Sequence, residues 1–91
     1  MAYDVDMDDE VKAAYWQLDY PIRLRIEKKL LQLTREDLGS RHLKHGVNCF
    51  VAEVGQYRIA YKLLESRRLK QVIFVGDHKA YERWYQEQDA F

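Results

Sequence analysis

Polar and apolar side chains alternate along residues 2–8, which is the periodicity of a half-buried β-strand. Between residues 9 and 18 the apolar positions recur every three or four residues instead, as they do along one face of a helix. Acidic residues stand at the start of that segment, where the helix dipole stabilises negative charge. The pattern therefore predicts a first strand followed by a short amphipathic helix.

A second helix is predicted from Pro21 onward. Proline suits the first turn of a helix because its missing amide hydrogen would have no partner there. Apolar residues then recur along one stripe, at Ile22, Ile26, Leu30 and Leu33. Only a short link around residues 19–21 separates the two helices, so we expect a helical hairpin.

Residues 36–48 lack a clear period and include two glycines, which predicts a loop. Gly55 and Gln56 suit a two-residue hairpin turn, and residues 65–68 suit a second turn. These turns separate three predicted strands, at residues 49–54, 57–64 and 69–75.

The last strand ends at Gly76, and Asp77 is a candidate N-cap for a final helix that begins at His78. The order of elements predicts an α+β domain over residues 1–91. In it, a helical hairpin and a C-terminal helix pack on one face of a mainly antiparallel four-stranded sheet. The other face would then be open for function.

The length and composition of the chain narrow the classes of protein to which it can belong. With 91 residues and 47% hydrophobic content, the chain has room and material for one compact domain. No apolar run approaches the roughly 20 residues needed to cross a bilayer. The N-terminus is acidic and unlike a secretion signal. Cys49 is the single cysteine, so no internal disulfide is possible, and we expect a buried thiol in a cytoplasmic protein.

The charges are balanced overall but unevenly distributed. The 15 basic and 15 acidic residues give a net charge of +0, which argues against a non-specific nucleic-acid binder. However, residues 21–79 hold 13 basic against 6 acidic residues, whereas both ends are acidic. Such a basic block can line a phosphate-binding cleft or simply form a solvated surface.

Arg58 is the first candidate for chemistry. In residues 57–64 the side chains alternate between faces, so the row of Tyr57, Ile59, Tyr61 and Leu63 would face the helices. Arg58 then lies on the open face in the middle of the sheet, where a guanidinium can hold a phosphate. A cross-strand ion pair with Glu53 explains the position equally well.

His78 is the second candidate, because an imidazole is suited to proton transfer at neutral pH. The aromatic residues of the last helix can stack on bases or supply a phenol, or can pack against the sheet; we expect at least Tyr81 or Trp84 to be in the core. The spacing of His42, His45 and Cys49 does not match a zinc site, so no metal or cofactor is expected. Neither a glycine-rich phosphate loop nor a nucleophile elbow is present, which leaves nucleotide hydrolysis and acyl transfer without support.

Short motifs along nearly the whole chain resemble toxins of the RelE/ParE toxin–antitoxin superfamily. In the front half these are Met1-Ala2-Tyr3, Leu18-Asp19-Tyr20-Pro21 and Arg25-Ile26-Glu27-Lys28-Lys29-Leu30-Leu31. In the back half they are Leu43-Lys44, Cys49-Phe50, Gly55-Gln56-Tyr57-Arg58-Ile59-Ala60-Tyr61 and Phe74-Val75-Gly76-Asp77-His78-Lys79-Ala80-Tyr81. The closing motif is most similar to HigB-like and archaeal RelE-like members.

The resemblance implies a RelE-like fold and a ribosome-dependent, metal-independent endonuclease that cleaves messenger RNA and is held inactive by a cognate antitoxin. Arg58 would stabilise charge on the phosphate, and His78 would act as general acid or base. Tyr85 is taken as the functional tyrosine. The residues expected to bind RNA are Arg41, Lys44, His45, Lys62, Lys79, Tyr81 and Trp84.

The sequence also departs from this family. Val51 and Glu53 occupy positions where relatives commonly carry lysine, and the chain is neutral where most such nucleases are basic. Two alternatives therefore stay open. One is a ParE-type toxin that inhibits DNA gyrase by binding, for which the last helix would matter more than His78. The other is an inactive relative that only binds an antitoxin.

Overall fold

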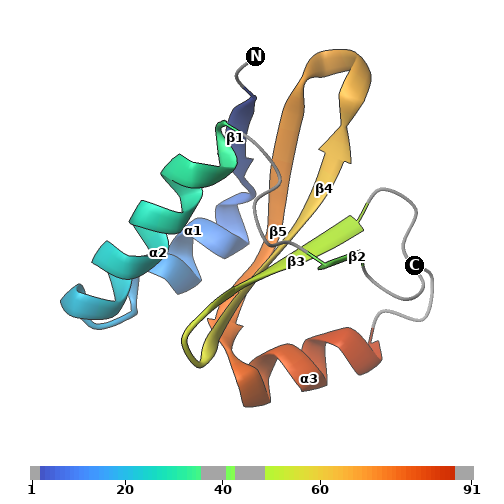
Figure 1. The fold of residues 1–91 in the computed structure, drawn as a ribbon. Helices are drawn as coiled ribbons and strands as arrows, with labels where there is room; N and C mark the ends of the chain where they lie inside the picture. The colour runs from blue at the N-terminus through green and yellow to red at the C-terminus, as the bar shows by residue number, and fades with distance from the viewer. Residues whose placement is uncertain (1–2, 36–40, 43–48, 88–91) are drawn as a thin grey trace.

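The strands form one sheet in the order β1-β5-β4-β3-β2, with β1 parallel to β5 and every other pair antiparallel. The computed structural model describes residues 3–35, 41–42 and 49–87. In chain order, its elements are β1 (Asp4–Met7), α1 (Asp9–Trp16), α2 (Tyr20–Leu33), β2 (Arg41–His42), β3 (Cys49–Val54), β4 (Tyr57–Leu64), the short 3-10 helix η1 (Glu65–Arg67), β5 (Leu69–Asp77) and α3 (His78–Glu87) (Figure 1).

The predicted α+β fold is confirmed. The four main strands, the helical hairpin and the closing helix all occur where the sequence patterns place them. The loop expected at residues 36–48 is partly wrong, because Arg41–His42 pairs with β3 as a two-residue edge strand. The rest of that loop lies outside the described residues. No helix in the described part of the chain is long and apolar enough to span a bilayer.

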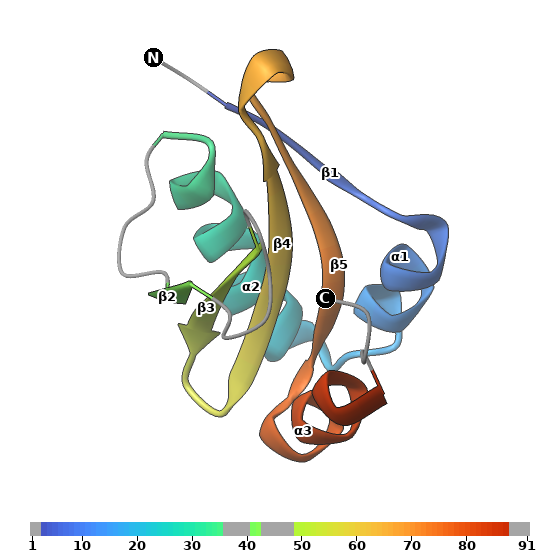
Figure 2. The same cartoon turned by 90° about the vertical axis from the view of Figure 1, so that its right-hand side faces the viewer.

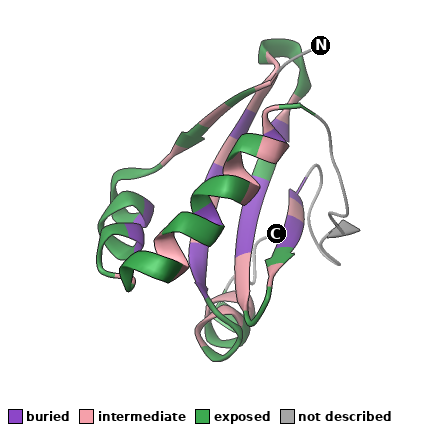
Figure 3. Ribbon diagram, turned by 60° about the vertical axis from the view of Figure 1, so that its left-hand side comes forward, coloured by how far each residue is buried: buried purple, intermediate pink, exposed green. Residues whose placement is uncertain are grey.

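The main core lies between the α1–α2 hairpin and one face of the sheet. Ile26 and Leu33 of α2 are fully buried against Ile59, Tyr61 and Val72 of the strands. Burial of each such side chain contributes about 1.5–3 kcal/mol to folding. Figure 3 shows the buried positions concentrated along the strands, while the outward side of the helices is exposed. The row that includes Ile59 and Tyr61 faces the helices, as predicted.

A β-bulge in β5 divides its side chains between the two faces of the sheet. Ala60 of β4 pairs with Phe74, but the next residue, Tyr61, pairs with Val72, so Ile73 is an extra residue. Without this residue, Val72 and Phe74 would share a face. With it, Val72 and Val75 both join the core under α1 and α2, and Phe74 is directed to the opposite face.

The opposite face is covered at one end by α3, so the expectation that every helix packs on the same face is wrong. Phe74 stacks against Trp84 and contacts Tyr81, with ring centroids 5.1 and 5.9 Å apart. Tyr81 and Tyr85 pack on Cys49 and Val51 in a second, smaller cluster. Figure 2 shows α3 in front of the lower end of the sheet, with α2 behind. The rest of this face is called the open face below.

Candidate active site on the open face of the sheet

Arg58 lies on the open face of β4, the strand between β3 and β5. Glu53 of β3 pairs with it on one side and Gly76 of β5 on the other. Its side chain is only 15% exposed. The sequence therefore placed this cation correctly, in the middle of the sheet and next to the strand that leads into α3.

The structure pairs Arg58 with Glu53, the alternative that the sequence left open. The Arg58 Nε and Glu53 Oε2 atoms are 3.9 Å apart. Nη1 donates hydrogen bonds to the carbonyl oxygens of Gly55 and Tyr57, each at 3.0 Å. Among the described residues, none accepts a hydrogen bond from Nη2. The guanidinium is therefore anchored to the β3–β4 turn through Nη1 and lies near Glu53 through Nε.

The turn that holds Arg58 also holds the start of α3. Gly55 has a φ of +59°, while Gln56 has no positive φ, which is the pattern of a type II′ hairpin turn. The Gln56 carbonyl accepts a hydrogen bond of 2.8 Å from the His78 backbone N–H. Because Arg58 pairs with Gly76, only one residue separates its partner from His78 in the sequence. Arg58 and His78 are thus brought to the same end of the open face.

His78 is the first residue of α3, and its side chain is 54% exposed. Its Nε2 lies 3.0 Å from Glu82 Oε1, one helical turn further on. This contact ties the ring to the next turn of the helix. Asp77 caps the helix as predicted, since its Oδ1 accepts a 2.8 Å hydrogen bond from the Ala80 backbone N–H. Glu82 was not among the residues predicted from the sequence, although its i,i+4 spacing from His78 is a signal that could have identified it.

Gly76 is needed where the strand passes beneath α3. A β-carbon added there would lie 2.7 Å from the Phe74 Cζ atom and 3.4 Å from the Ala80 β-carbon. The Phe74 ring therefore fills the space that a side chain would occupy. This close packing fixes the distance between the sheet and the first turn of α3, which contains His78.

The aromatic side chains of α3 pack against one another and the sheet. Tyr81 stacks on Tyr85 with ring centroids 6.0 Å apart and lies beside Trp84. All three are half-buried, and none is fully enclosed. The expectation that Tyr81 or Trp84 lies in the core is thus wrong in part: neither is buried, but Tyr81 packs against the smaller cluster of Cys49 and Val51. Each retains exposed surface for a base or a phenolic contact.

Cys49 and Lys62 lie next to this cluster and pair across β3 and β4. Burial raises the pKa of the Cys49 thiol, and the nearby Lys62 ammonium offsets part of that shift. Cys49 is 3% exposed. Its thiol is therefore buried and unreactive, as the sequence predicts. Lys62 itself is exposed on the open face.

The remaining predicted RNA contacts are only partly placed. Lys79 is exposed in the first turn of α3. The backbone of Arg41 pairs with Val51 in β2, at the edge of the sheet. Lys44 and His45 lie outside the described residues. Strand pairing and the backbone hydrogen bond from His78 to Gln56 thus place Arg58 and the start of α3 at the same end of the sheet.

No protein-family model matches the sequence, and no curated protein matches it. Solved structures do resemble the fold. A free mutant of the Escherichia coli toxin RelE has 24% identity and a TM-score of 0.76 over 93% of both chains. The Mycobacterium tuberculosis RelBE2 toxin–antitoxin complex matches with 20% identity and a TM-score of 0.77, over 85% of this chain and 92% of that one. The archaeal RelE–RelB complex from Pyrococcus horikoshii matches with 16% identity and a TM-score of 0.72, over 86% and 97%.

Proposed function

We propose that this chain, which has the fold of the RelE toxins, is the toxin of a type II toxin–antitoxin pair and an endoribonuclease that cleaves messenger RNA on the ribosome. The observation that supports this most is the position of Arg58 and His78 at one end of the open face. An anchored guanidinium and an exposed imidazole there supply the two groups that metal-independent RNA cleavage requires.

In the proposed reaction, the ribose 2′-hydroxyl attacks the adjacent phosphorus atom. The new bond from the 2′-oxygen to phosphorus forms as the bond from phosphorus to the 5′-oxygen breaks. Arg58 stabilises the negative charge that develops on the non-bridging oxygens, using Nη2. Overall, the proton lost by the 2′-hydroxyl ends on the leaving 5′-oxygen, and His78 serves one of the two transfers, as base to the 2′-hydroxyl or as acid to the 5′-oxygen. The products are a 2′,3′-cyclic phosphate and a 5′-hydroxyl, so the balanced reaction needs no water and no metal.

The proposed partners follow from the same fold. The structures of RelBE2 and of the archaeal RelE–RelB pair are toxin–antitoxin complexes. We therefore propose that a cognate antitoxin binds this chain and that the protein acts in the cytoplasm, where translated messages are found. Tyr85, Tyr81 and Trp84 would stack on bases exposed near the cleavage point.

A second candidate function is binding without cleavage, as in a gyrase-inhibiting toxin or an inactive antitoxin-binding relative. The observation that favours it is the pairing of Glu53 with Arg58. A carboxylate at this point repels a phosphate and competes with it for the guanidinium. Val51 is an uncharged residue buried under Tyr81 and Tyr85, so this position does not supply the cation that relatives commonly have there.

Expression of the chain alone in bacteria separates these functions. The parent should arrest growth and produce new messenger-RNA 5′ ends within translated reading frames. Arg58→Ala and His78→Ala should lose both effects while keeping the circular dichroism spectrum of the parent. Arg67→Ala, an exposed cation in η1, is the matched control and should behave as the parent. Growth arrest with intact RNA would favour the binding toxin, and no arrest would favour the inactive relative.

A further inference from the structure

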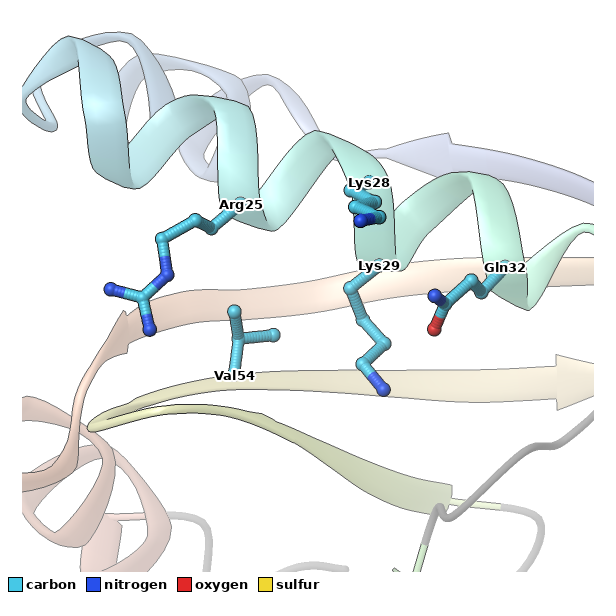
Figure 4. Close-up of a pocket in the computed structure, with 5 residues that line it drawn as sticks. All are labelled: Arg25, Lys28, Lys29, Gln32 and Val54. Atoms are coloured by element: carbon cyan, nitrogen blue, oxygen red, sulfur yellow. The ribbon is translucent and has the colours of Figure 1, made fainter.

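A second cationic feature lies between α2 and the β3 end of the β3–β4 hairpin. Arg25, Lys28, Lys29 and Gln32 of α2 and Val54 of β3 line a hollow of about 330 Å³, called the α2 groove here. Figure 4 shows these α2 side chains following the length of the helix, with Arg25, Lys29 and Gln32 extending toward the strands around Val54. The lining contains three cations and no carboxylate.

These cations are not neutralised by the surrounding structure. Within residues 3–35, 41–42 and 49–87, Arg25, Lys28 and Lys29 form no ion pair. The acidic residue of the same helix, Glu27, instead lines a different hollow with Lys12 and β1. The two sides of α2 therefore differ in charge, and the cationic side borders the groove.

The groove and the Arg58 site meet at one glycine. A β-carbon on Gly55 would lie 2.7 Å from Arg25 Nη2, so the guanidinium rests directly on the turn. The Gly55 carbonyl oxygen accepts the hydrogen bond from Arg58 Nη1. Arg25 and Arg58 thus approach the same residue from α2 and from the open face. Any side chain at this position would separate the groove from the turn, and the φ of +59° adds strain to such a change.

We propose that the α2 groove is a second, non-catalytic binding site for phosphate groups of an RNA backbone, reached around the β3–β4 turn from the Arg58 site. Successive side chains on this face of α2 lie one helical turn apart, about 5.4 Å along the axis, which gives a row of contacts to a chain of phosphates. An acidic protein segment would also meet three cations, but continuity with the Arg58 site favours RNA. This inference rests on the proposed function, because it assigns the groove to the same ligand.

The test is the salt dependence of RNA binding. The probe is a fluorescent 12-nucleotide RNA with 2′-O-methyl groups throughout, which binds but offers no 2′-hydroxyl for cleavage. Fluorescence anisotropy gives the affinity between 50 and 200 mM salt for the parent and for a variant with Arg25→Gln, Lys28→Gln and Lys29→Gln. Each lost phosphate contact lowers the slope of log affinity against log salt by about 0.7, so the variant should lose about 2 from the parent's slope. Over this four-fold salt range the parent's affinity should then fall about 16 times more than the variant's.

A control variant removes the same charge elsewhere. Lys12, Arg35 and Arg67 are exposed and line no part of the groove, and their triple replacement by Gln should keep the parent's slope. Equal slopes for the two triple variants, or no measurable binding by the parent, would overturn the proposal. It would also be overturned if the groove variant bound RNA normally but lost affinity for an acidic peptide such as polyglutamate. Growth arrest and cleavage are measured in separate experiments. If the chain binds RNA through the groove but does not cleave it, the proposed nuclease activity is contradicted while the groove remains an RNA-binding site.

Discussion

If the chain has the proposed function, replacement of Glu53 by Gln should make it bind RNA more tightly. Glu53 Oε2 lies 3.9 Å from Arg58 Nε, and its side chain is 51% exposed. A half-exposed ion pair of this kind contributes about 0.2–1 kcal/mol to folding, so the variant should lose no more than that in its free energy of unfolding. Arg58 keeps its two carbonyl contacts to the β3–β4 turn and should stay in place.

The effect on RNA follows from the charge that is removed. A phosphate bound at Arg58 would lie about 4–6 Å from the Glu53 carboxylate, and at water-like screening two negative charges at that distance repel by about 0.7–1 kcal/mol. Removing this repulsion should improve binding by about three- to five-fold. The gain should be in KM, because substrate and transition state both bear the phosphate charge.

Cleavage of a defined message on programmed ribosomes measures both constants. Glu65→Gln is the control, because Glu65 is an exposed acid in η1 and its loss changes net charge equally. We expect a lower KM with Glu53→Gln alone and an unchanged kcat. A large fall in kcat would instead make Glu53 a participant in proton transfer and contradict its role as a competitor for Arg58.

Three further predictions concern the parts that hold the site. Asp77→Ala should lower the free energy of unfolding by about 1 kcal/mol through loss of the cap on Ala80 and should also reduce cleavage; chemical denaturation without such a loss would contradict the cap. Gly76→Ala should destabilise by about 1–3 kcal/mol because its β-carbon meets Phe74, and an unchanged melting temperature would refute the clash. The pKa of the Cys49 thiol is raised in the folded state, so folding favours the protonated thiol. Its contribution to the free energy of unfolding is therefore fully present below the thiol's unfolded pKa of about 8.5 and declines as the pH rises above that value. The melting temperature of the parent should fall more between pH 7.5 and 9.5 than that of Cys49→Ala; equal falls would contradict this.

Side-chain periodicity was sufficient for most of the fold. Alternation along residues 57–64 placed Arg58 on the open face because the extra residue of the bulge lies in β5, not β4, and the apolar row of β4 faces the helices. Helical spacing and the Asp77 cap likewise located α3. These features depend on local preferences that act within a few residues, so the sequence alone displays them.

The position of α3 could not be predicted in the same way. It depends on the bulge at Ile73, which shifts the alternation of β5 by one residue and directs Phe74 to the open face. An apolar run from Val72 to Val75 is compatible with either register, and only pairing with β4 selects one. The partner of Arg58 could not be predicted either. A phosphate-binding arginine and an arginine paired with Glu53 both require a cation at this position, so the sequence pattern is the same for the two.

In the proposed mechanism, Arg58 and His78 promote attack by a ribose 2′-hydroxyl, and the chemistry of the cleaved ends reveals whether this attack occurs. The purified protein is given programmed ribosomes with a message whose cleaved nucleotide is either ribose or a single 2′-deoxyribose, and the new ends are identified. We expect cleavage of the ribose message alone, leaving a 2′,3′-cyclic phosphate and a 5′-hydroxyl, with loss of this activity in folded Arg58→Ala and His78→Ala. Cleavage of the deoxy-substituted message at the same bond, or a 5′-phosphate product, would contradict it.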